Sequence, residues 1–265
     1  MEFKTIRSDI DHRGVATLSL ARPEVHNAMN GEMYDEARAV VRDLAADASV
    51  RLLVLTAEGK TFCSGGDLRY QQQQRSAPRQ EKLHEARKLA LWLREIDALP
   101  FPVIGRINGP AYAGGLGLIS VCDIAIGLRS ARFAITEARL GLVPGMISPF
   151  VVRRIGVPNA RRLILSARMF SGTEAVRYGL LQEAVAEDEL DQAVEAEIEL
   201  ILKCAPQAVA TCKRLIDYVS QHDSADNLIY TVDRVADMWE SPEAIEGMAS
   251  FIEKRAPAWA VKENG

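Results

Sequence analysis

Two glycine-rich turns, each between a short apolar run and a helical pattern, constrain the fold of this chain more than any other feature. Ser64-Gly65-Gly66 follows the run from Arg51 to Thr56, and Gly114-Gly115 follows the run from 103 to 107. Short apolar runs bounded by turns are typical of buried strands. Glycine lets the main chain turn sharply and come close to another group. The repeated order of strand, glycine turn and helix predicts an α/β fold.

The chain divides into an α/β part and a helical tail. Residues 15–20 alternate as a half-buried strand does, and apolar spacings of three and four predict helices over 30–44 and 81–99. Residues 69–82 are polar and rich in Gln, which predicts a mobile loop or a frayed helix and makes this segment a candidate pocket lid. Beyond Pro158 the patterns are almost wholly helical, at 160–165, 173–178, 189–202, 206–219 and 228–239. We expect a core over residues 1–195 and a helical region over 196–265.

Composition narrows the function classes. With 265 residues, 48% hydrophobic and 26% charged, the chain is typical of a globular enzyme. Its formal charge of −4 does not favour nucleic-acid binding, and no apolar run approaches the ~20 residues that span a bilayer. No secretory segment precedes Asp9. The four cysteines have no metal-ligand spacing, so we expect a cytoplasmic protein without a metal site.

A lone acid, Glu137, follows the second glycine turn and suits enolate chemistry on a thioester. Removing a proton from an acyl thioester, or adding hydroxide to it, puts negative charge on the carbonyl oxygen. Two preorganised backbone N–H groups stabilise that charge in a dry site. Glycine-rich turns present such groups, so the two turns and the acid together predict an acyl-thioester enzyme.

These segments resemble the crotonase superfamily of acyl-CoA hydratases and isomerases. The resemblance runs from Arg22-Pro23-Glu24-Val25-His26-Asn27-Ala28, through both glycine turns, to Phe251-Ile252-Glu253-Lys254-Arg255. It implies an α/β crotonase-type spiral of repeated β-β-α units with a helical C-terminal trimerisation region. It also implies a homotrimer or a dimer of trimers that acts on acyl-CoA, with coenzyme A as part of the substrate and no separate cofactor.

The resemblance assigns the catalytic parts residue by residue. It implies that the N–H groups of Gly66 and Gly114 hold the thioester oxygen and that Glu137 is the acid and base. Many hydratases of the superfamily carry two Glu residues, but Gly117 stands at the position of the first one. Glu137 is therefore expected to perform both proton transfers or to share them with water.

Apolar surroundings would make Glu137 a better acid and base. Leu140, Leu142 and Val143 follow it closely in the chain. If they surround the carboxyl group, burial raises its pKa towards neutrality.

The resemblance also implies contacts with coenzyme A. Ser64 would offer its backbone carbonyl to the adenine, and His26 would lie near the nucleotide. Phe251 and Lys254 would reach the site from the C-terminal helix, either of the same chain or of a neighbouring subunit.

Two segments narrow the expected reaction. Residues 144–152 and 117–123 look like those of bacterial hydratases of branched glutaconyl thioesters. This implies hydration of 3-methylglutaconyl-CoA or isohexenylglutaconyl-CoA, in leucine or acyclic terpene catabolism. One carboxylate also suits an enoyl-CoA isomerase, which moves a proton between two carbons. A relative that only binds acyl-CoA or RNA is the third alternative.

Glutaconyl substrates carry a second carboxylate, so a cation near the acyl group is expected. Arg69, Arg139 and Arg153 are the candidates, and residues near Met146 and in the segment 70–75 are expected to set the pocket length.

Four further residues near the glycine turns are expected to have structural roles. Asp67 and Asp123 suit turns or helix caps, because a carboxylate there accepts backbone N–H bonds. Cys63 and Cys122 are expected to be small buried residues, because no His lies near either in sequence.

Overall fold

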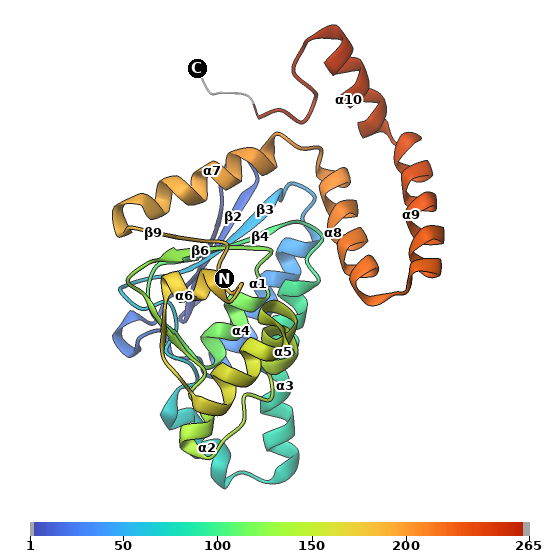
Figure 1. Cartoon of the computed structure of the whole chain (residues 1–265). Helices are drawn as coiled ribbons and strands as arrows, with labels where there is room; N and C mark the ends of the chain where they lie inside the picture. Colours follow the sequence, from blue (N-terminus) through green and yellow to red (C-terminus); the bar gives the residue numbers. More distant parts are fainter. Residues whose placement is uncertain (1–2, 262–265) are drawn as a thin grey trace.

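Six strands form the main sheet of the computed structural model, which describes residues 3–261 (Figure 1). Strand β1 (Ile6–Ile10) pairs antiparallel with β2 (Val15–Leu20), and every later neighbour is parallel. The order continues through β3 (Leu52–Ala57), β4 (Val103–Ile107), β6 (Ile124–Leu128) and β9 (Glu183–Val185). All six residues of β3 are buried, as expected for a strand covered on both faces. The α/β prediction is confirmed.

A smaller sheet joins the two glycine turns. It contains β5 (Ala111–Tyr112), β7 (Arg132–Ala134) and β8 (Phe170–Ser171). Cys63 forms an isolated parallel bridge with Ala111, and the Tyr112 N–H donates to the Cys63 carbonyl at 2.9 Å. The chain before Gly66 therefore lies beside the chain before Gly114.

Helices cover both faces of the main sheet (Figure 1). On one side α1 (Gly31–Ala46) packs against α3 (Arg79–Asp97), and on the other α7 (Leu190–Leu202) contacts β4 and β6. Asn30 caps α1 by accepting the Met33 N–H at 2.9 Å. The buried residues of α1 are mainly those of the predicted apolar face, Met33, Ala37, Val40, Val41 and Leu44.

The polar segment after the first glycine turn is a helix, α2 (Leu68–Ser76), so the loop alternative is wrong. The Asp67 carboxylate accepts the N–H groups of Arg69 and Tyr70 at 2.9 and 3.3 Å, which confirms its capping role. Pro78 disfavours helical geometry at Ala77, where α2 ends. No residue of α2 is buried, so the helix has no apolar periodicity that would reveal it in the sequence.

Three shorter or bent helices complete the core. All seven residues of α4 (Gly114–Ser120) are buried. Helix α5 (Ser148–Ser166) bends at Gly156, whose φ is +73°, so the predicted helix at 160–165 is only its second half. Helix α6 (Gly172–Arg177) begins with a capping box formed by Ser171 and Glu174. Single turns of 3₁₀ helix occur at η1 (Pro23–Val25), η2 (Glu137–Leu140) and η3 (Glu187–Glu189).

Three C-terminal helices extend from the core as an arm (Figure 1). They are α8 (Pro206–Gln221), α9 (Ser224–Trp239) and α10 (Pro242–Glu253). The Arg51 guanidinium donates to the carbonyls of Leu202, Cys204 and Trp259 at 2.8–3.2 Å, which ties both ends of the arm to the core. The predicted division between residues 195 and 196 falls inside α7, and that division stays a prediction.

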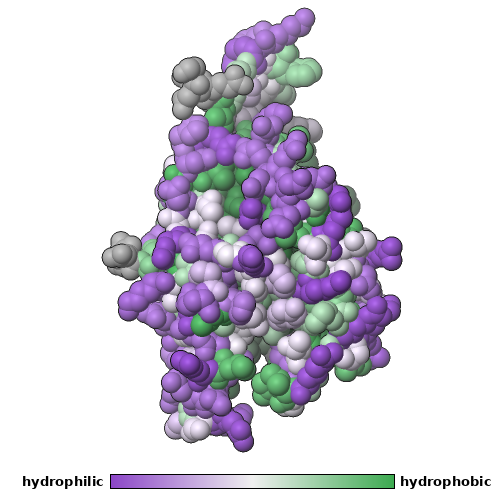
Figure 2. All heavy atoms as spheres, turned by 90° about the vertical axis from the view of Figure 1, so that its left-hand side faces the viewer, coloured by the Kyte–Doolittle hydropathy of each residue, from purple (hydrophilic) through white to green (hydrophobic). Residues whose placement is uncertain are grey.

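The molecular surface is mainly hydrophilic, with local apolar areas. Figure 2 shows apolar atoms near the junction of core and arm and beside a notch at the lower end, at the height of α2 in Figure 1. The arm exposes large apolar side chains at Ile216, Leu228, Ile229, Val232, Trp239, Ile245, Phe251 and Ile252. Within residues 3–261, no helix has both the length and the hydrophobicity that crossing a bilayer requires.

Candidate active site

The first glycine turn leaves the Gly66 N–H available. Met29 donates its N–H to the Gly65 carbonyl and accepts the Asp67 N–H, both at 2.8 Å. In this parallel bridge the residues on either side of Gly66 make the bonds, so the Gly66 N–H faces away from Met29. No acceptor within residues 3–261 receives it.

The second glycine turn leaves the Gly114 N–H available for a different reason. Gly114 is the first residue of α4, and first-turn N–H groups have no partner within their helix. No other acceptor within residues 3–261 receives this N–H. The preceding Ala113 has a φ of +49°, an uncommon value for alanine, and is held by donating to the Ala134 carbonyl at 3.0 Å.

Met29 connects the two turns. Its backbone pairs with the residues around Gly66, and a Cβ placed on Gly114 would lie only 2.2 Å from the Met29 Cε. A side chain at 114 would therefore have to displace the Met29 methyl group, which lies at the end of a flexible side chain. The role of Met29 depends on two segments that are distant in the chain, so no local motif in the sequence indicates it.

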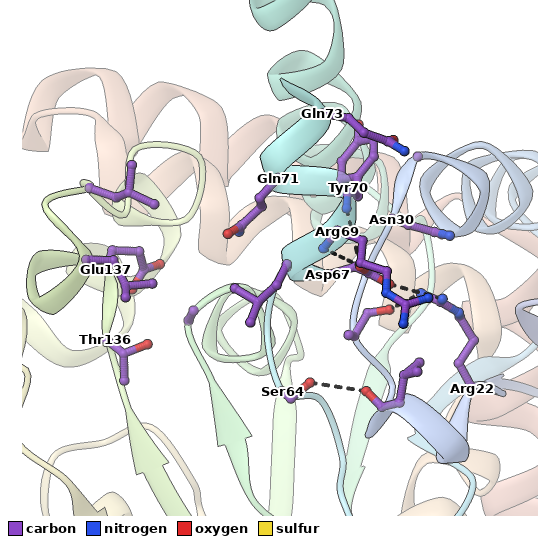
Figure 3. Close-up of a pocket in the computed structure, with 18 of the residues that line it drawn as sticks. Arg22, Asn30, Ser64, Asp67, Arg69, Tyr70, Gln71, Gln73, Thr136 and Glu137 are labelled. Carbon is purple, nitrogen blue, oxygen red and sulfur yellow. Dashed lines mark hydrogen bonds and ion pairs between the residues drawn. The ribbon is translucent and has the colours of Figure 1, made fainter. Parts of the chain in front are cut away.

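Ser64 and Gly66 of the first turn and Ala113, which directly precedes Gly114, border a cleft of about 760 Å³, whereas Gly114 itself is not among the residues that line it. In Figure 3, Thr136 and Glu137 form one side of it, and α2 with Asp67, Arg69 and Tyr70 forms the other. The remaining lining residues are Arg22, Val25, Ala28, Asn30, Gly31, Glu32, Ser64, Gly66, Leu68, Gln71, Gln73, Ala113, Leu140 and Leu142.

Glu137 is the cleft carboxylate that, within residues 3–261, pairs with no cation. Three carboxylates line the cleft, but Asp67 pairs with Arg22 at 3.1 Å and Glu32 pairs with Lys4 at 3.1 Å. The Oε2 atom of Glu137 is buried and accepts no hydrogen bond within residues 3–261. Burial raises the pKa of Glu137, which keeps the carboxyl group poised for proton transfer.

The apolar surroundings of Glu137 are partly as predicted. Leu140 and Leu142 line the cleft with it. Val143 does not line the cleft and is 78% exposed, so that part of the prediction is wrong. The reason is the left-handed turn at Gly141, with φ +69°, which ends η2 and redirects the following chain.

Apolar side chains fill the space beside Gly117, the position at which many hydratases of the superfamily carry their first Glu. Gly117 lies within buried α4, and a Cβ on it would lie 2.5 Å from Cγ2 of Ile147 and 3.1 Å from Cδ1 of Leu93. Apolar packing thus takes the volume that an acidic side chain at 117 would need.

The residues expected to meet coenzyme A lie in two places. Ser64 lines the cleft, and its N–H donates to the His26 carbonyl at 3.0 Å, so His26 is its direct neighbour. Phe251 and Lys254 lie at the end of α10 and do not line the cleft of their own chain. Phe251 is 85% exposed.

The three candidate arginines differ in position. Arg69 lines the cleft, Arg139 does not line it, and Arg153 pairs with Asp97. Arg153 does not line the cleft, so of the three arginines only Arg69 borders it.

The structural roles expected near the turns are present. The Asp123 carboxylate accepts the Val103 N–H and the Lys213 ammonium, both at 2.7 Å. Cys63 and Cys122 are buried, and burial raises the pKa of each thiol to about 12, which makes both poor nucleophiles.

Residues 11–262 match the model of the enoyl-CoA hydratase/isomerase family. The chain belongs to this family. The enoyl-CoA hydratase ACTT6 of Alternaria alternata is 34% identical over 251 residues, which cover 91% of this chain and 80% of that protein. An enoyl-CoA hydratase structure from Shewanella pealeana superposes with a TM-score of 0.93 at 33% identity, covering 97% of both chains. The structure of Pseudomonas aeruginosa AtuE also superposes with a TM-score of 0.93, at 36% identity, and the match covers 97% of this chain and all of AtuE.

Family membership confirms the crotonase fold with C-terminal helices and the prediction of an enzyme. The protein is a hydro-lyase of the enoyl-CoA hydratase type, and the family implies an acyl-CoA substrate. These relationships do not support a protein that only binds acyl-CoA or RNA.

Proposed function

We propose that this enoyl-CoA hydratase adds water to a branched glutaconyl-CoA, 3-methylglutaconyl-CoA or isohexenylglutaconyl-CoA. Glu137 is the acid and base, and the N–H groups of Gly66 and Gly114 hold the thioester oxygen. The observation that carries the mechanism is the state of Glu137: of the cleft carboxylates within residues 3–261, it is the one without a cation, and its Oε2 accepts no hydrogen bond.

The proposed hydration needs one carboxylate. Glu137 takes a proton from water while the water oxygen bonds to the β-carbon, and the C=C electrons move to the enolate. The two glycine N–H groups stabilise the negative charge on the thioester oxygen. Glu137 then gives its proton to the α-carbon, which leaves a 3-hydroxyacyl-CoA and regenerates the carboxylate.

The position of the segment 144–152 beside the site supports the proposal of a branched substrate. In the segment 144–152, Ile147 packs against Gly117 and Met146 lines a second cavity beside Gly66. The residues that resemble glutaconyl-CoA hydratases thus border the site. The proposed routes are leucine or acyclic terpene catabolism.

The isomerase alternative rests on the same carboxylate. Because Ile147 and Leu93 fill the place of a second acid, Glu137 alone carries protons between carbons in either reaction. The two reactions differ in whether oxygen from water enters the product.

The protein is also proposed to assemble as a homotrimer or a dimer of trimers. The arm exposes a row of large apolar side chains, which suits contact with another copy. In such an assembly, Phe251 and Lys254 of a neighbouring subunit would approach the coenzyme A near Ser64 and His26.

A cytoplasmic location is also part of the proposal. The four cysteines are unpaired, and Cys204 and Cys212 are exposed. Free exposed thiols persist in a reducing compartment. Fractionation of cells that express the protein, followed by immunoblotting, checks this location.

Mass spectrometry in heavy-oxygen water tests the reaction. The purified protein is given crotonyl-, 3-methylglutaconyl- and isohexenylglutaconyl-CoA and a 3-enoyl-CoA. Entry of the heavy oxygen into a glutaconyl product supports the proposal, and the amounts of label show whether 3-methylglutaconyl-CoA or isohexenylglutaconyl-CoA is the better substrate. Label in the crotonyl product alone removes the branched substrate, and double-bond migration without label makes the protein an isomerase.

A further inference from the structure

A second cavity opens beside the predicted oxyanion donor. It measures about 160 Å³ and shares Gly66, Tyr70 and Gln71 with the main cleft. A Cβ placed on Gly66 would lie 2.3 Å from Nε2 of Gln71, so the Gln71 amide lies against this glycine. In Figure 3, Gln71 extends from α2 towards the side of the cleft that carries Glu137. The two cavities therefore adjoin at Gly66, so an acyl group whose carbonyl oxygen meets Gly66 would lie beside the second cavity.

The body of the second cavity is mainly apolar. Leu89 and the ring of Tyr34 are buried, and Ala86 and Met146 complete the apolar wall. These groups suit the methylene part of an acyl branch.

The acidic group of the second cavity is already paired. Glu85 accepts the Tyr70 hydroxyl and lies 3.2 Å from the Lys88 ammonium. Lys88 also contacts Asp35 at 2.9 Å, and Asp35 is mostly exposed to solvent. Glu85 is therefore turned towards its own partners.

Three polar groups of the second cavity have no partner within residues 3–261. Lys82 is an exposed residue at the edge of the cavity, and its ammonium makes no ion pair or hydrogen bond there; the Tyr34 hydroxyl donates to no acceptor. The Gln74 Oε1 is buried and accepts no hydrogen bond. Turning the Gln74 amide would thus break no contact and would direct its NH₂ group inwards. The cavity combines an apolar body with one free cation and free donors.

From this arrangement we infer that the second cavity binds the carboxymethyl branch of the acyl group, with Lys82 as the residue that selects a distal carboxylate. The inference rests on the proposed glutaconyl substrate and identifies the subsite for one of the two groups on its β-carbon. Lys82 thus has the role for which Arg69, Arg139 and Arg153 are the candidates in the sequence. The other branch lies along Leu140 and Leu142 in the main cleft. Lys82 is a specificity residue and takes part in no proton transfer.

A binding experiment tests the subsite without requiring turnover. 3-Methylglutaryl-CoA and isovaleryl-CoA differ only by the distal carboxylate, and neither has a double bond to hydrate. We expect calorimetry to give at least tenfold tighter binding of 3-methylglutaryl-CoA by the native assembly. Lys82→Met should abolish this preference without changing the isovaleryl-CoA affinity, and Lys82→Arg should restore most of it.

The matched control is Arg79→Gln, which removes one positive charge from the same helix outside both cavities. It should leave the preference unchanged. An equal preference in Lys82→Met and wild type overturns the subsite even if glutaconyl-CoA is hydrated. Loss of the preference in Lys82→Met, with no hydration of glutaconyl-CoA by wild type, supports the subsite and overturns the proposed reaction.

Discussion

The Ile147 side chain occupies the space into which any side chain at Gly117 would extend. The closest approach, 2.5 Å from a Cβ on Gly117 to the Ile147 Cγ2, is well below a van der Waals contact. The helix α4 around Gly117 is buried, so it has little room to move. This contact explains how the fold accommodates the absence of a second acid, and it also prevents the simple restoration of one.

Gly117→Ala should therefore destabilise the protein. Alanine normally favours a helix over glycine by up to about 1 kcal/mol, but overpacking a core costs about 1–3 kcal/mol. We expect a net loss in the free energy of unfolding, measured in urea. Gly145→Ala is the control, because its Cβ would meet only Val143 at 3.8 Å, and it should stay within about 0.5 kcal/mol. Equal stability of the two variants would contradict the packing argument.

Glu137→Gln should lower kcat by about 10²–10⁴, the usual contribution of a positioned acid or base. KM should change little, because the substitution preserves the shape of the side chain. Steady-state hydration kinetics measure both values, with circular dichroism to verify folding. A kcat equal to that of wild type would remove Glu137 from the mechanism.

The raised pKa of Glu137 also predicts a pH-dependent effect on stability. The folded state binds this proton more tightly than the unfolded state, so ionisation of Glu137 costs stability as pH rises above the unfolded value of about 4.3. Glu137→Gln removes that cost. Its unfolding temperature should equal that of wild type near pH 4, exceed it at pH 7 and stay higher at pH 8.

Asp67→Asn is the control for this measurement. Backbone N–H bonds from Tyr70 and Arg69 and the Arg22 ion pair outweigh burial and hold the pKa of Asp67 below its usual range. Asp67 therefore stabilises the fold above its unfolded pKa, and this stabilisation is lost as pH falls towards the folded pKa. Asp67→Asn should lower the unfolding temperature at pH 7, opposite in sign to Glu137→Gln. The same sign for both variants would refute this electrostatic account.

The proposed donor at Gly114 is tested by comparing Gly114→Pro with Gly114→Ala. Each adds a Cβ that meets the Met29 methyl group, but only proline removes the N–H. Loss of one oxyanion donor costs about 10²–10³ in kcat. We expect Gly114→Pro to lose at least this much relative to Gly114→Ala, with thermal unfolding to show that both fold. Equal kcat values in two folded variants would exclude the Gly114 N–H as a donor.

The apolar side chains of the arm should hold the proposed assembly together. Leu228 on α9 is 66% exposed, and Leu228→Asp would bury a charge in a contact between copies. We expect sedimentation to show a trimer or hexamer for wild type and smaller species for Leu228→Asp. Asp233→Asn on the same helix should not change the mass. A wild-type monomer would remove the assembly from the proposal.

Local patterns in the sequence determined the elements that carry the site. Strand β3 is a continuous apolar run, and α1 repeats apolar residues at spacings of three and four, so both follow from neighbouring residues. The glycine turns and Glu137 were recognised from short motifs. Helix α2 lacked such a pattern because it buries none of its residues.

Tertiary structure decided what surrounds those residues. Met29 meets Gly114, Ile147 fills the space at Gly117, and Lys82 lines a cavity with Gly66. The separation of Glu137 from any cation is likewise a property of the folded cleft. These relationships join residues far apart in the chain. Their distances depend on how helices and turns pack together, which local periodicity does not encode.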